Sequence, residues 1–288
     1  MTTLIDTSDS QIVYINSRDR TSGTDSDFTY NVNLRPGNDY DKVVMLQAAI
    51  SKSFFAIQTG YNTMTLSENG KTISVSLPAG NYTRKVMAAQ IATSLTAASV
   101  TLGNNWTYTV TYPKSASQVD NGYYVYEVSG ATSQPAFIFG SVSENFIYLC
   151  FGFDPSSTNT FTGNTLTSTN VINLQAEDAI FIHSDCCINY NDNILQEIYA
   201  NVGSISYSNI YWQNYNISAY SKKLTGNTSN EFRFYITNED GVPLNFNGQN
   251  VQWTLLFYHE DSIISKVKAF MQYISYNVFK ITGDNSTH

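Results

Sequence analysis

The residues best suited to chemistry in this chain are one histidine and two adjacent thiols, His183, Cys186 and Cys187. A histidine beside a thiol can activate it as a nucleophile, and the same three residues could begin a zinc site. Zinc requires three or four protein ligands, and the sequence holds no second cluster of cysteine and histidine to complete the set. We therefore favour a structural interpretation, in which the thiols pack in a core and a hydrogen bond holds His183.

The other candidate groups lie where solvent or a turn would place them. His259 follows an apolar strand, and we expect it at the solvated rim of the fold. Adjacent carboxylates occur at Glu177 with Asp178 and at Glu239 with Asp240. Turns favour such acidic residues for local hydrogen bonding, so the pairs do not indicate a glycosidase dyad. Phosphate loops, dinucleotide fingerprints, nucleophile elbows and zinc-protease motifs are absent from the sequence. We expect no enzymatic activity, and we assign no catalytic, cofactor-binding or metal residues and no cofactor.

Charge is scarce in this chain of 288 residues. It carries 15 Lys and Arg against 23 Asp and Glu, so its formal net charge is −8, and an acidic chain of this kind is not expected to bind nucleic acid. Charged residues make up 13% of the sequence, about half of the roughly 25% that is usual. Twenty-one tyrosines and many amides and hydroxyls take their place.

A surface poor in charge and rich in tyrosine resembles the interior of a protein–protein contact. The hydrophobic fraction, 42%, is too high for a disordered chain. We therefore interpret the composition as that of a self-associating building block. The alternative is a β-protein whose serines, threonines and asparagines simply occupy loops and strand edges.

The cysteine count and the hydropathy set expectations about compartment. The three cysteines include an adjacent pair, which rarely forms a disulfide because the Cα–Cα geometry is unfavourable. No apolar segment typical of a secretory signal follows Met1, and no run of about 18 apolar residues suggests a membrane span. We expect free thiols and folding in the cytosol.

The hydrophobic pattern predicts an all-β sandwich or jelly roll. Residues 28–34, 232–237 and 251–258 alternate apolar and polar side chains, as half-buried strands do, and Asn69-Gly70 predicts a hairpin turn. The clearest helix is expected at about 84–98. Two further elements are expected: a strand at 146–151 and a short helical connector at 193–198.

Four stretches then resemble the penton (vertex capsid) proteins of virophages and related polinton-like viruses, in the same order over about residues 11–258. They are Tyr-Ile-Asn-Ser-Arg-Asp-Arg at 14–20, Leu-Pro-Ala-Gly-Asn-Tyr-Thr at 77–83, Asn-Ile-Leu-Gln-Glu-Ile at 193–198, and the long run from Phe232 to Phe257. The resemblance implies a single jelly roll standing upright in an icosahedral shell. It also implies a homopentamer at each vertex of the virion, contact with the major capsid protein, and no catalysis.

The chain is longer than eight strands require, so we expect a β-rich insertion with one short helix at about 58–140 within a jelly-roll domain at 27–260. We interpret residues 1–26 as an N-terminal arm, interrupted by a possible short strand at 11–15, or as a frayed terminus. Residues 261–288 read as a helical tail that packs on its own sandwich or on a neighbour. A virus attachment module that binds glycans through exposed tyrosine and tryptophan is the main alternative, and a hydrolase on a β-sandwich is the least favoured.

Overall fold

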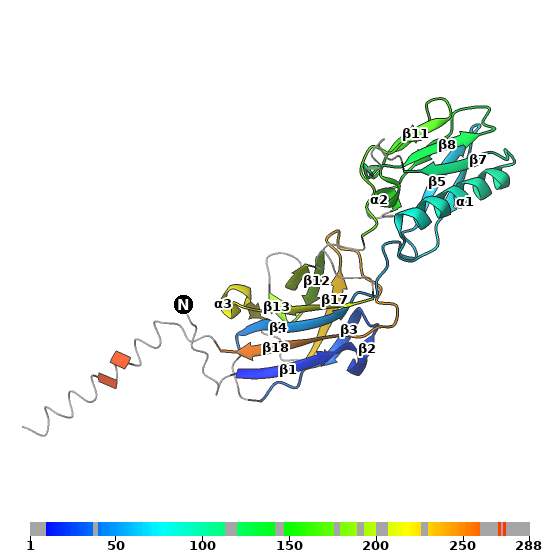
Figure 1. Cartoon of the computed structure of the whole chain (residues 1–288). Helices are drawn as coiled ribbons and strands as arrows, with labels where there is room; N and C mark the ends of the chain where they lie inside the picture. Colours follow the sequence, from blue (N-terminus) through cyan, green and yellow to red (C-terminus); the bar gives the residue numbers. More distant parts are fainter. Residues whose placement is uncertain are drawn as a thin grey trace, which may run out of the picture.

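The chain folds into two units, each built around its own hydrophobic core (Figure 1). The computed structural model describes residues 10–36, 40–112, 120–141, 147–175, 179–188, 193–199, 207–225, 230–259, 270–271 and 273–274. The lower unit in Figure 1 is a sandwich of two antiparallel sheets, and the upper unit is formed by residues between β4 and β12.

The first sheet, called sheet A, has the order β1-β18-β4-β16-β13, and β15 also pairs with β4. Its strands are β1 (Ser10–Asn16), β4 (Lys42–Ser51), β13 (Cys187–Ile188), β15 (Asn209–Gln213), β16 (Lys222–Leu224) and β18 (Val251–Tyr258). β15 and β16 pair with opposite ends of β4. They therefore act as one interrupted strand, broken by the short helix α3 (Ile217–Tyr220).

The second sheet, sheet B, has the order β14-β12-β17-β3-β2. Its strands are β2 (Ser22–Gly23), β3 (Asp27–Asn31), β12 (Ala179–Ser184), β14 (Ile194–Tyr199) and β17 (Glu231–Thr237). The 3₁₀ turn η2 (Ser17–Asp19) carries the chain from sheet A to sheet B.

The strand order identifies the sandwich as a jelly roll. Along the chain the main strands are β1, β3, β4, β12, β14, the β15/β16 pair, β17 and β18. Numbered first to eighth, they lie in the order 1-8-3-6 in sheet A and 2-7-4-5 in sheet B. Such alternation between two sheets, with two Greek keys, is the jelly-roll arrangement. The expected all-β class is therefore confirmed.

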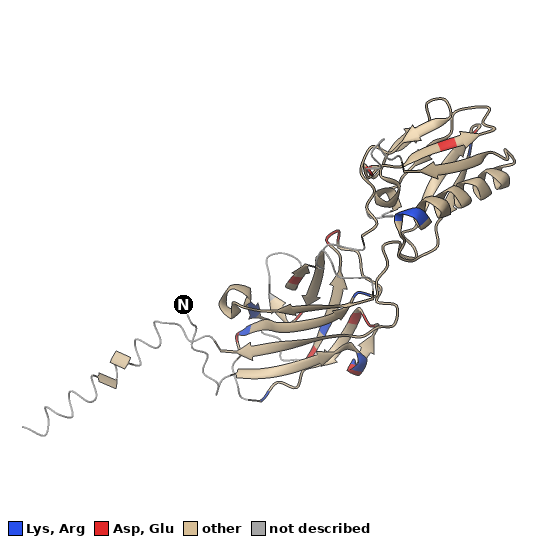
Figure 2. Cartoon of the chain, in the orientation of Figure 1, with Lys and Arg blue, Asp and Glu red and all other residues tan. Residues whose placement is uncertain are grey.

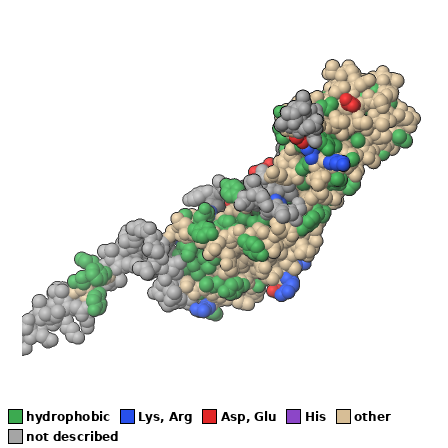
Figure 3. All heavy atoms as spheres, in the orientation of Figure 1, with side chains coloured by type: hydrophobic (Ala, Val, Ile, Leu, Met, Phe, Trp, Pro, Cys, Tyr) green, Lys and Arg blue, Asp and Glu red, His purple; other side chains and the backbone are tan. Residues whose placement is uncertain are grey.

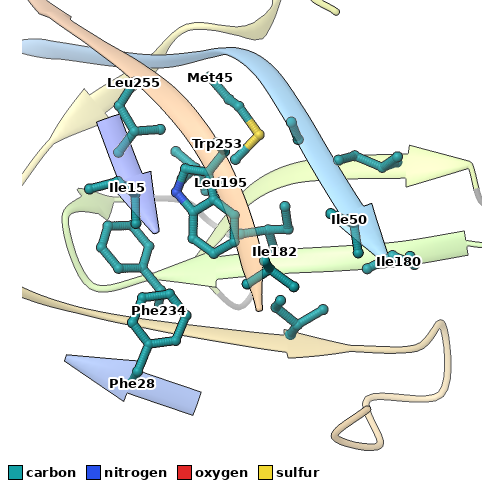
Figure 4. Packing of buried hydrophobic residues seen from close by; sticks show 14 of the residues in the cluster. Ile15, Phe28, Met45, Ile50, Ile180, Ile182, Leu195, Phe234, Trp253 and Leu255 are labelled. Atoms are coloured by element: carbon teal, nitrogen blue, oxygen red, sulfur yellow. The ribbon is translucent and has the colours of Figure 1, made fainter. Parts of the chain in front are cut away.

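Alternating side chains from the two sheets meet in the sandwich core. Phe28 on β3 lies 5.8 Å from Phe234 on β17 and 5.7 Å from Trp253 on β18, measured between ring centroids. Figure 4 shows these rings meeting Ile15 and Ile182 between the sheets. The period-2 pattern of the sequence thus directs alternate side chains of these strands into the core between the sheets, as the sandwich requires.

The stretch at 11–15 lies within β1 and belongs to the sandwich. β1 pairs with β18 over its whole length, from Ser10 opposite Tyr258 to Asn16 opposite Gln252, and buries Val13 and Ile15 in the core. This differs from the arm expected at 1–26, because the short apolar stretch completes sheet A. We propose that the jelly-roll domain begins at Ser10; residues 1–9 lie outside the described part of the chain.

The upper unit has two small sheets, β10-β9-β5-β6 and β11-β8-β7, with helix α1 beside them. Its elements are β5 (Thr63–Glu68), β6 (Lys71–Ser76), α1 (Arg84–Leu102), β7 (Thr107–Thr111), β8 (Val125–Ser129), β9 (Ala136–Ile138), α2 (Ile147–Phe151), β10 (Thr158–Thr160) and β11 (Thr165–Thr167). The expected hairpin is confirmed: Glu68 pairs with Lys71, and Asn69 and Gly70 take the positive φ values, 47° and 71°, of a tight turn.

Helix α1 begins and ends on specific caps. The Thr83 side chain accepts a hydrogen bond from the Val86 amide at its start, and Gly103 ends it in the left-handed conformation with φ of 82°. The helix buries Met87, Ile91 and Leu95. It extends four residues beyond its expected end at about 98, up to the glycine that can adopt this conformation.

The upper core includes residues well beyond 140, where the insertion was expected to end. Tyr126 stacks on Phe151 at 6.0 Å with the planes 9° apart, and Phe137 meets Phe161 edge-on at 5.2 Å. The stretch 146–151 was expected to be a strand, but its described residues form helix α2, since a short apolar run does not by itself distinguish a buried helix from a strand. We propose that the inserted unit spans about 57–174.

Two further expectations meet the structure at the edges of the sandwich. Residues 194–199 form strand β14 and not a helical connector, because pairing with β12 outweighs local propensity.

The tail at 261–288 lies almost wholly outside the described residues; Phe270, Met271, Tyr273 and Ile274 are helical and exposed. Among the described helices, none is long and apolar enough to cross a membrane.

Candidate functional site

His183 is held as a structural residue on the outer side of sheet B. Its ring stacks on Tyr235 with centroids 4.4 Å apart and planes 3° apart, and its Nε2 lies 2.9 Å from the hydroxyl of Thr237. Both neighbours come from the paired strand β17. The ring is therefore fixed by stacking and by a hydrogen bond, and it is 6% exposed.

The two thiols lie in the core between the sheets, Cys186 in the turn after β12 and Cys187 at the start of β13 in sheet A. Cys186 and Cys187 are fully buried in the sandwich core with Ile180 and Ile182, whereas the ring of His183 faces outward onto Tyr235. The hydrogen bond between the thiols and their burial raise the pKa of Cys186, while the same bond lowers the pKa of Cys187. The structure thus separates the histidine from the thiols, and the arrangement does not form an accessible nucleophile.

The remaining sequence candidates do not converge. His259 lies 3.7 Å from a carboxylate oxygen of Asp41 at the end of β18, and Glu239 and Asp240 are exposed in the turn after β17. Glu177 with Asp178 falls outside the described residues. Within the described part of the chain, no group of three or more histidine, cysteine and acidic residues could hold a metal ion.

The outer surface of sheet B carries an ordered charged pair. The Arg233 guanidinium donates two hydrogen bonds to the Asp27 carboxylate, at 2.8 and 2.7 Å, and lies 4.9 Å from the centre of the Tyr235 ring. A bidentate geometry is among the stronger forms of ion pair, and it satisfies the charges of these two residues.

The upper unit contains a buried carboxylate that the sequence analysis did not single out. Glu68 is 1% exposed and accepts hydrogen bonds from the Tyr108 hydroxyl at 2.7 Å, the Ser99 hydroxyl at 2.8 Å and the Asn104 amide at 2.8 Å. These donors tie the hairpin to the end of helix α1 and to β7. A buried carboxyl group with three hydrogen-bond donors is well compensated, and we assign it a structural role.

The outer surface of sheet A differs from that of sheet B, because strand pairing aligns two rows of uncharged side chains across it. The first row contains Tyr14, Thr254, Gln47 and Gln213. The second row contains Asn16, Gln252, Ala49 and Tyr211. Each row runs across β1, β18, β4 and β15, and all eight residues line one groove of about 760 Å³.

Tyrosines stand on both sides of this groove, which we call the sheet A groove. Tyr14 on β1 is 71% exposed and Tyr211 on β15 is 77% exposed, and Tyr215, in the turn after β15, is 91% exposed. Further along the sheet, helix α3 packs Ile217 over Val44 and covers the outer face there. The groove is the part of this face that α3 leaves open.

Side-chain amides in the groove have hydrogen-bond donors and acceptors that are not used within the described residues. The Gln47 side chain donates to the Thr254 hydroxyl at 3.2 Å. Within the described residues, the exposed side chains of Gln213 and Gln252 make no hydrogen bond. Asp19 at one end is the one described lining residue that is charged at neutral pH. The arrangement suits an uncharged ligand that can both donate and accept hydrogen bonds.

Sequence reasoning did not find the groove. The alternation in β1 and β15 places Tyr14 and Tyr211 on the solvent side of their strands, which is a signal the sequence contains. Their placement in one groove depends on β18 and β4 lying between them, and this long-range pairing cannot be read from local pattern.

Comparisons with known proteins give a likeness in structure. No family model matches the chain, and no curated protein matches it in sequence. Among solved structures, the chain is similar to the crystal structure of selenomethionine-labelled mavirus penton protein, with 12% identity over 86% of this chain and 99% of that chain and a TM-score of 0.43. The overlap is too loose for a functional conclusion to rest on it.

Proposed function

We propose that this chain is a structural capsid protein of an icosahedral double-stranded DNA virus, that five copies form the ring at each vertex, and that the ring contacts the major capsid protein. In this proposal the chain is not an enzyme and its place is the virion. The observation that carries the proposal is the jelly-roll strand order of the sandwich, together with the second unit carried between β4 and β12.

Jelly rolls also occur in lectins and other proteins, so the fold alone does not distinguish a capsid protein. The surface of the molecule gives a second reason for the proposal. Charged side chains are sparse over both units in Figure 2. On the face seen in Figure 3, hydrophobic and tyrosine side chains gather over the sandwich and the described charges lie toward its edges. A subunit that buries its flanks against neighbours avoids the desolvation cost of charge. This supports a chain that functions in an assembly.

The motifs that resemble virophage pentons lie mainly in the jelly roll. The stretch from Tyr14 to Arg20 spans the end of β1 and η2, the stretch at 193–198 includes most of β14, and the long run from Phe232 covers β17 and β18. The stretch at 77–83 precedes helix α1 in the upper unit. The resemblance therefore follows strands that define the fold.

A ring requires two different patches on each subunit, and the sandwich has two opposite edges. β1 ends sheet A on one side, next to β3, where the Tyr30 hydroxyl donates to the Tyr14 carbonyl at 3.2 Å. β14 ends sheet B on the other side. Ile12 on β1 and Tyr199 on β14 are 51% and 71% exposed, and we propose that these two edges meet around the five-fold axis.

Native mass spectrometry of the purified chain tests this proposal. We expect a five-copy assembly for the wild type and its loss in Ile12→Asp and in Tyr199→Asp, because each places a charge in a closed contact. Lys85→Asp, an exposed change on helix α1 away from both edges, is the control and should leave the assembly intact. A wild-type assembly that tolerates both edge substitutions would exclude these edges as the contact.

A further inference from the structure

We propose that the sheet A groove binds a short neutral oligosaccharide. This site goes beyond the capsid function and does not rest on it. The inference comes from the joint presence of exposed tyrosine rings, unengaged amides and a near absence of charge in one groove of about 760 Å³, a volume within the roughly 300–1,000 Å³ usual for small-molecule sites.

The tyrosines supply the stacking surfaces. Pyranose rings present faces of C–H groups and a rim of hydroxyls, and a tyrosine combines an apolar ring with a polar hydroxyl. Tyr14 and Tyr211 are on β1 and β15, which are separated by β18 and β4. Three strand spacings amount to roughly 14 Å, which is the scale of a short oligosaccharide and more than one monosaccharide needs.

The groove floor supplies hydrogen bonds of the right kind. Gln252 and Gln47 lie between the tyrosines, and Gln213 lies beside Tyr211 on β15. An amide both donates and accepts, so it can pair with a sugar hydroxyl in either sense. Because the side chains of Gln213 and Gln252 make no hydrogen bond within the described residues, a sugar would not have to break an existing one.

The charge of the groove selects against other ligands. Among the described lining residues there is no lysine or arginine, so nucleic acids and sulfated or sialylated glycans gain no electrostatic attraction there. Asp19 lies 3.5 Å from the Arg18 guanidinium, so its charge is partly balanced, and its carboxylate can accept hydrogen bonds from neutral sugar hydroxyls. A second copy of the chain is the competing occupant, and the experiment separates it from a sugar.

The test is titration calorimetry of the full chain with maltotriose, cellotriose and chitotriose, and with a heparin-derived trisaccharide as the anionic probe. We expect at least one neutral trisaccharide to bind, and the heparin fragment not to bind. Tyr14→Ala and Tyr211→Ala should each weaken the per-site Kd by roughly tenfold or more. Both side chains are mainly exposed, so these variants should fold.

Tyr199→Asp is the matched control, since Tyr199 is as exposed as Tyr14 but lies on β14 of the other sheet. It should leave sugar affinity unchanged even though it is expected to disrupt the ring. Tyr211→Ala, on β15 away from both proposed ring edges, should lose sugar and keep the ring, whereas Tyr14 shares β1 with Ile12 and its variant tests sugar affinity alone. Gln252→Leu should weaken binding without removing a tyrosine. The proposal is overturned if none of the neutral probes binds at about 10 mM, if groove variants bind them normally, or if Tyr211→Ala loses subunit association instead.

Discussion

At the scale of single residues, the chemistry that His183 could perform is limited by what surrounds it. One nitrogen lies against Thr237, one ring face lies against Tyr235, and the neighbouring thiols are buried in the core on the other side of the sheet. These side-chain contacts join β12 to β17 in addition to their backbone pairing. We infer that the residue stabilises sheet B and does not act on a substrate.

Replacing His183 with alanine should therefore change stability and not assembly. The loss of one hydrogen bond and one stacked pair is expected to lower the free energy of unfolding by about 1–3 kcal/mol. Chemical denaturation measures this change, and native mass spectrometry measures assembly. His259→Ala, at a more exposed position, is the control. Loss of assembly at temperatures where the His183→Ala subunit is folded would show that this residue has another role.

The sequence predicts the role of a residue when that role follows from nearby positions, and it does not when the role depends on pairing with distant strands. The structural interpretation of His183 rests on the lack of further ligands in the sequence, and a hydrogen bond holds the ring as that interpretation expects. Its partner Thr237 is 54 positions away, so the partner itself could not be predicted from local pattern. The role of Gln252 in a groove depends on its pairing with Asn16, more than two hundred positions away, and with Ala49. No local pattern contains that information, because register is fixed by the assembled sheet.

At the scale of elements, strong alternation predicts strands and weak alternation does not. β17 and β18 are found where period-2 patterning places them, and the hairpin turns at Asn69 and Gly70. The stretches at 146–151 and 194–199 were assigned the wrong type. The first is short, apolar and buried, and the second follows Asn193 at a φ of 54° and is shaped by its pairing with β12.

The inserted unit is expected to fold by itself. Its core is separate from the sandwich core, and Phe151, Phe153 and Phe161 lie within it, each at most 1% exposed. A fragment of residues 57–174 should give a single cooperative thermal transition by circular dichroism. A matched fragment of residues 57–140 lacks these rings, each worth about 1.5–3 kcal/mol on burial, and should not fold. Equal transitions in both fragments would place the boundary near 140.

At the scale of the whole molecule, the scarcity of charge connects composition to architecture. The sequence carries about half the usual charge, and in the structure the ordered ion pair of Arg233 and Asp27 lies on sheet B while the rows across sheet A are uncharged. The proposed ring uses the two edges of the sandwich, and the proposed sugar site uses the open face of sheet A. The two surfaces share β1, but Tyr211 belongs to the groove alone and Tyr199 to a ring edge alone. Variants at these two positions therefore let the two proposals fail separately.

Imaging of particles assembled from this chain and the major capsid protein of the same virus, with five-fold averaging at the vertices, tests the central claim most directly. We predict five copies around each vertex, each with a sandwich and a smaller second unit, joined through β1 of one copy and β14 of the next. Vertices that form normally without this chain, or density that places it elsewhere in the shell, would contradict the proposal.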